Sequence, residues 1–72
     1  MDLRQAAREL YGLSPQERLE LRDRVLMFLR ARSDEPAIRD SIRRLANTSL
    51  EYPEPVEQLL VELDEQLCSL RR

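Results

Sequence analysis

The segment PVEQLLVELDEQLCSLRR, residues 55–72, repeats apolar residues at the spacing of an amphipathic helix. Five of them are separated by four, three, four and three positions, which is the spacing of a coiled-coil seam. This set, named the leucine seam below, comprises Val56, Leu60, Leu63, Leu67 and Leu70. A helix that packs inside a small bundle shows the same spacing. The segment therefore predicts a helix over residues 55–70 whose leucines either close the core of this chain or contact a second molecule.

The rest of the chain is divided by its few prolines and its one glycine. The clearest helix start is SPQE, where Ser14 is the N-cap, Pro15 takes the first helical position and Glu17 completes a capping box. Just before it, Gly12 stands where a left-handed residue would end an earlier helix. In the run TSLEYPEP, residues 48–55, two prolines disfavour regular helix, because the residue before each proline is pushed toward an extended conformation.

The remaining periodic segments are also helical in spacing, and none alternates as a strand would. The sequence therefore predicts a single all-α domain over residues 1–72. We expect a compact four-helix arrangement with helices at about 2–11, 15–32, 36–46 and 55–70. The run VLMFL, residues 25–29, is apolar all round and should lie at the centre of this fold.

A chain of 72 residues has a small core, which supplies only about 3–5 kcal/mol of net stability. With one Cys and no His, neither an internal disulfide nor a histidine-containing zinc site can add to it, and we expect no cofactor. Association is the remaining means of stabilisation. The leucine seam is also too long to be covered by the short first helix, because a helix rises about 1.5 Å per residue. We therefore expect Leu59, Leu60 and Leu63 to close the core, and Leu67 and Leu70 to contact a partner.

Charge is distributed unevenly along the chain. Residues 1–50 hold ten Arg against eight acids, whereas residues 51–72 hold six acids and two Arg. The densest basic cluster, the candidate basic face, comprises Arg30, Arg32, Arg39, Arg43 and Arg44. This face could be solvated and paired with acids of the last helix, or the third helix could contact DNA as a recognition helix. The sequence pI of about 5.1 argues against a phosphate-binding footprint.

An enzymatic function is not expected. There is no His to act as a base near neutral pH, and a single Gly cannot build a phosphate-binding loop. No apolar run approaches the roughly 18 residues of a membrane span, so we expect a soluble, cytoplasmic protein with no membrane partner. All twelve basic residues are Arg. This bias is typical of GC-rich coding sequence and indicates a bacterial or phage protein.

The stretch LSPQERLEL, residues 13–21, resembles the openings of helices in several short bacterial antitoxin-like proteins. The resemblance covers nine of 72 residues and largely restates the capping box. It implies a small regulator that touches DNA, which is our alternative hypothesis, acting through the Arg-rich third helix. The main hypothesis is a non-enzymatic protein-interaction module. We expect it to be an adaptor, inhibitor or regulatory subunit that binds a protein partner and self-associates as a dimer through its last helix.

Overall fold

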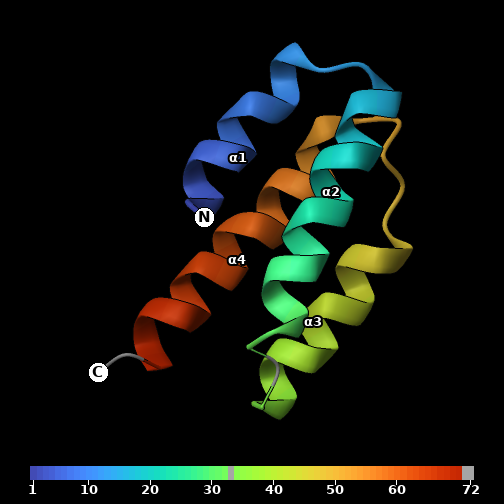
Figure 1. The fold of residues 1–72 in the computed structure, drawn as a ribbon. Helices are drawn as coiled ribbons and strands as arrows, with labels where there is room; N and C mark the ends of the chain where they lie inside the picture. The colour runs from blue at the N-terminus through green and yellow to red at the C-terminus, as the bar shows by residue number, and fades with distance from the viewer. Residues whose placement is uncertain (33, 71–72) are drawn as a thin grey trace.

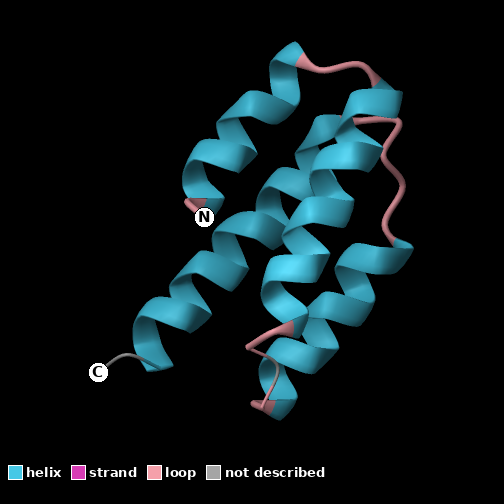
Figure 2. Cartoon of the chain, in the orientation of Figure 1, coloured by secondary structure: helices cyan, strands magenta, loops and turns pink. Residues whose placement is uncertain are grey.

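The computed structural model describes residues 1–32 and 34–70, and this part of the chain consists of helices joined by loops (Figures 1 and 2). The elements are α1 (Leu3–Glu9) with a 3-10 turn η1 (Leu10–Gly12), α2 (Pro15–Arg30), α3 (Pro36–Asn47) and α4 (Pro53–Leu70). Successive helices run in alternating directions (Figure 1). The predicted all-α four-helix fold is confirmed.

Side-chain caps explain where the first two helices begin. Asp2 Oδ1 accepts from the backbone N–H of Arg4 at 3.0 Å and of Gln5 at 3.2 Å. The capping box of α2 is formed as predicted: the Glu17 N–H donates to Ser14 Oγ at 3.3 Å, and the Ser14 N–H donates to Glu17 Oε1 at 3.0 Å. The hydrogen bond from the Ser14 backbone N–H stabilises the ionised carboxylate and lowers the pKa of Glu17. Both starts follow from residue types that satisfy helix-end N–H groups.

The start of α4 differs from the prediction. The helix begins at Pro53, not at residue 55, so two prolines lie in its first turn. The first four N–H groups of a helix have no acceptor within the helix, and prolines placed there lose no hydrogen bond. Glu54 is helical, although a residue before a proline usually prefers an extended backbone.

The end of the first helix was also predicted wrongly, because Gly12 has no positive φ. The chain leaves α1 through η1, and the Leu13 N–H donates to the Leu10 carbonyl at 3.3 Å. This tight turn satisfies the carbonyl without a left-handed residue. A similar turn ends α2 at Arg30, two residues early, where the Arg32 N–H donates to the Leu29 carbonyl at 2.9 Å.

The core is almost entirely aliphatic. Its buried side chains come from every helix and are Leu3, Ala6, Ala7, Leu10, Leu21, Val25, Leu26, Leu29, Ile38, Ile42, Leu45, Val56, Leu59, Leu60 and Leu63. The run of residues 25–29 is not central on all sides, since Met27 is 72% exposed and Phe28 is half-buried. One side of α2 has no helix against it, and Met27 lies on that side.

Helix α4 packs against α1 on one side and against α3 on the other, while α2 packs against α3. Arg18 of α2 ties the connections together. Its guanidinium donates to the carbonyls of Leu10 at 3.1 Å, Leu50 at 3.0 Å and Glu51 at 2.8 Å. Arg18 therefore fixes the loop that leads into α4 to α2, and fixes α2 to the start of η1.

Candidate functional site

The leucine seam changes from buried to exposed along α4. Val56, Leu60 and Leu63 are buried with less than 2% exposure, and Leu59 beside them is also buried. Leu67 is only half-buried, and Leu70 is 51% exposed. The prediction that the early leucines close the core is confirmed. The contact of Leu67 and Leu70 with a partner stays a prediction.

The cause of this change is the register of α1 on α4. Arg4 Nε donates to Asp64 Oδ2 at 2.7 Å, and Tyr11 Oη donates to Glu57 Oε1 at 2.9 Å. The segment α1–η1 therefore runs antiparallel to α4, with Tyr11 of η1 beside Glu57 and the start of α1 beside Asp64 and Glu65. The Glu57 carboxylate accepts the phenol proton in a hydrogen bond and so raises the pKa of Tyr11. The last turns of α4 extend past the N-terminal end of α1 (Figure 1).

The other side of α4 faces α3 through two polar contacts. Ser41, only 2% exposed, donates through its hydroxyl to Gln66 Oε1 at 3.1 Å. One turn further along α3, Arg44 Nη1 lies 3.5 Å from Glu62 Oε2 at the surface. These contacts fix how α3 lies along the second half of α4.

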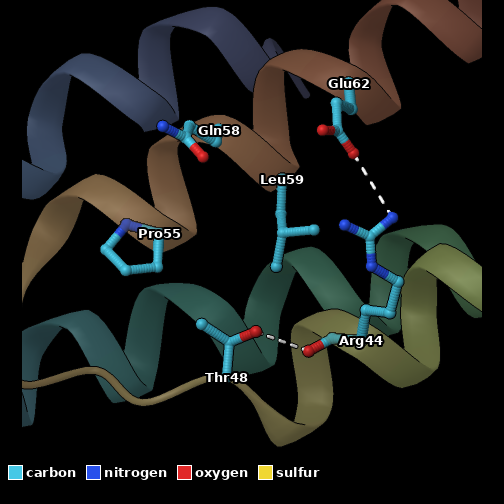
Figure 3. A pocket seen from close by; sticks show the side chains of 6 residues that line it. All are labelled: Arg44, Thr48, Pro55, Gln58, Leu59 and Glu62. Atoms are coloured by element: carbon cyan, nitrogen blue, oxygen red, sulfur yellow. Dashed lines mark hydrogen bonds and ion pairs between the residues drawn. The ribbon is translucent and has the colours of Figure 1, made fainter.

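Two hollows open along this junction, which we name the α3–α4 groove. The Pro55 hollow lies at the start of α4, where Leu59 points toward α3 between the flanking polar side chains (Figure 3). It is lined by Arg44, Thr48, Pro55, Gln58, Leu59 and Glu62. The Leu70 hollow lies at the far end of α4 and is lined by Glu35, Ala37, Ile38, Gln66, Ser69 and Leu70.

Sequence reasoning missed this groove. In the sequence, the groove corresponds to positions with small or uncharged polar residues on the facing flanks of two helices whose other outer positions are mostly charged. Ser41, Gln66 and Ser69 are such positions. Such positions stand out only when the pairing and register of α3 and α4 are known. The apolar spacing of each helix does not contain that information.

The candidate basic face is divided between two sides of the molecule. All five of its side chains are exposed. Arg44 points toward α4, where it forms an ion pair with Glu62. Arg39 and Arg43 point away from α4 on the other flank of α3, because successive residues of a helix are rotated by roughly 100°. The guanidinium carbon Cζ of Arg32 lies 4.6 Å from the centre of the Phe28 ring. Arg30 is the last residue of α2. Arg39 and Arg43 line one surface hollow with Pro36 and Asp40, and Arg44 lies apart from them. DNA binding through α3 stays a prediction.

Within residues 1–32 and 34–70, no helix is both long and apolar enough to cross a membrane. The same residues contain no group of three or more acidic or cysteine side chains placed to hold a metal ion. Cys68 is a free, exposed thiol.

The chain was compared with protein-family models, curated proteins and solved structures. No family model, no curated protein and no solved structure matches it. Its function has to be argued from its own residues.

Proposed function

We propose that this protein is a cytoplasmic binding module of bacterial or phage type that acts by contacting another protein, as an adaptor, inhibitor or regulatory subunit. In this proposal it self-associates through the end of α4. The observation that carries the proposal is the exposure of Leu70, at 51%, at the end of a stripe whose earlier members are buried.

A single exposed leucine is common on protein surfaces and would need no explanation. Leu70 is different because it continues the same helical face as the half-buried Leu67 and also lines a hollow with Ala37 and Ile38. Apolar side chains that border a hollow on so small a protein favour association. A chain of 72 residues without a disulfide gains stability when such a surface is covered.

The test is the double variant Leu67→Glu with Leu70→Glu. The parent should be a dimer at micromolar concentration by sedimentation. The variant should be a monomer, because dimerisation would bury two carboxylates in the contact. Its helical circular dichroism should match that of the parent. The matched control is Met27→Glu with Tyr52→Glu, which puts acids at two other exposed apolar positions. The control should remain a dimer.

Unfolding of the double variant would assign both leucines to the core of one chain. The single variant Leu70→Glu then decides, because the exposed side chain of Leu70 contributes little to that core. A folded Leu70→Glu protein that dimerises like the parent would overturn the proposal.

A further inference from the structure

The α3–α4 groove carries little net charge for a protein in which 36% of residues are charged. Nine of the twelve residues that line its two hollows are uncharged. The Arg44–Glu62 ion pair, which lines the Pro55 hollow, is neutral as a unit. The hollow on the outer side of α4 is lined by Glu57, Glu65 and by Glu62, which it shares with the Pro55 hollow. Two copies that met through the outer side would bring Glu57 and Glu65 together without a basic side chain, whereas the groove offers Arg44 beside Glu62.

The end of α4 is too small to form a specific dimer alone. A standard interface covers about 800 Å² on each partner. The accessible surface of this protein is 4788 Å², so such an interface would take about a sixth of it. Leu67 and Leu70 supply only part of that area. The Leu70 hollow adds to that area, because Leu70 itself lines it together with residues of α3.

Charge selects one arrangement of the two copies. In a two-fold dimer the same surface of each copy has to complement itself. If α3 lay over α3, each Arg44 would face the other Arg44. A two-fold axis along the groove instead places α3 of each copy over α4 of the other. Arg44 then faces Glu62 of the second copy, and the two Leu70 ends meet.

We infer that a second copy of this chain docks along the α3–α4 groove about such an axis, with Leu70 entering the Leu70 hollow of the second copy beside the exposed Ala37. This inference rests on the proposed self-association and specifies its geometry. The groove provides the uncharged, hollowed centre of the contact, and Arg44 and Glu62 determine its orientation.

The first test places acids in the groove. Gln58→Glu with Ser69→Glu adds one carboxylate to each hollow, and Gln5→Glu with Gln16→Glu adds the same charge at exposed positions of α1 and α2. We expect the dimer dissociation constant, measured by sedimentation equilibrium, to rise at least about tenfold for the groove variant and to stay within about twofold for the control. Circular dichroism should show parental helicity for both.

The second test reads the orientation. Arg44→Glu and Glu62→Arg each place like charges inside the groove, so each protein alone should dimerise more weakly than the parent. An equimolar mixture should form a one-to-one heterodimer, since every facing pair then has opposite signs. A mixture that associates no better than either variant alone would overturn the two-fold arrangement.

The outcomes separate the inference from the proposed function. A groove variant that dimerises like its control, while Leu67→Glu with Leu70→Glu gives a monomer, overturns the groove dimer and leaves the proposed function standing. A parent protein that stays monomeric at micromolar concentration overturns both the groove dimer and the proposed self-association.

Discussion

The two halves of α4 have the same apolar spacing but different surroundings. In the first half Val56, Leu60 and Leu63 are buried, and in the second half Leu67 is half-buried and Leu70 is exposed. The difference comes from α1, whose first turn lies beside Asp64 and Glu65, so that α1 does not reach the end of α4. Spacing therefore determines which face of a helix is apolar, whereas the length of the neighbouring helix determines how much of that face is buried.

The largest effect should come from removing a leucine of the covered half. Leu63→Ala leaves a cavity at a fully buried position and should lower the free energy of unfolding by about 3 kcal/mol. Leu70→Ala, at the exposed end of the same seam, should lower it by less than about 0.5 kcal/mol in the monomer. Urea unfolding of both variants measures this difference. Equal losses would mean that the two halves of α4 are equally buried in solution.

A smaller loss should follow when the loop before α4 is released from α2. Arg18→Gln removes a charged donor from three backbone carbonyls and should cost about 2 kcal/mol. Hydrogen exchange should then accelerate at the start of α4 more than at its end. Arg24→Gln, at an exposed position of the same helix, is the control. Exchange that accelerates equally along α4 would contradict a local role for Arg18.

Ser41→Ala tests the contact between α3 and the second half of α4. Gln66 would lose its buried hydroxyl donor, which should cost about 1 kcal/mol in thermal or urea unfolding. Gln5→Ala, at an exposed position of α1 outside the groove, should have no measurable effect. If the two variants unfold alike, the Ser41–Gln66 hydrogen bond does not hold the end of α4 to α3.

The smallest loss of stability should come from removing the Arg4–Asp64 ion pair, which joins the start of α1 to α4. Arg4→Gln removes an exposed partner of Asp64, and ion pairs of this kind contribute little because water and salt screen them. The shift in urea midpoint should be the smallest of the four and should disappear at high salt. Arg8→Gln, on the same helix, is the control. A salt-independent loss as large as that of Ser41→Ala would show that this pair holds α1 in place.

Much of the fold could be predicted from local signals. Ser14, Pro15 and Glu17 specify a helix start by chemistry that acts within one turn, and the seam spacing identifies the buried face of α4. The start at Pro53 and the right-handed Gly12 could not be predicted in the same way. At these positions the free energies of alternative helix ends differ little, and tertiary packing decides between them.

Less of the candidate site could be predicted. The exposure of Leu70 followed from comparing helix lengths, but the α3–α4 groove depends on which flank of α3 faces α4. Ser41 and Arg44 identify that flank only through contacts with Gln66 and Glu62, which lie 25 and 18 residues away in sequence. Grouping Arg39, Arg43 and Arg44 by closeness in sequence missed this, because neighbouring positions on a helix point in different directions.

The pairing of α1 with α4 has a consequence for synthesis of the protein on the ribosome. The contact that places the start of α1 on α4 joins Arg4 to Asp64, 60 positions apart in sequence, so it cannot form until Asp64 has been translated. The apolar face of α1, with Leu3, Ala6 and Ala7, therefore lacks its main packing partner while α2 and α3 emerge.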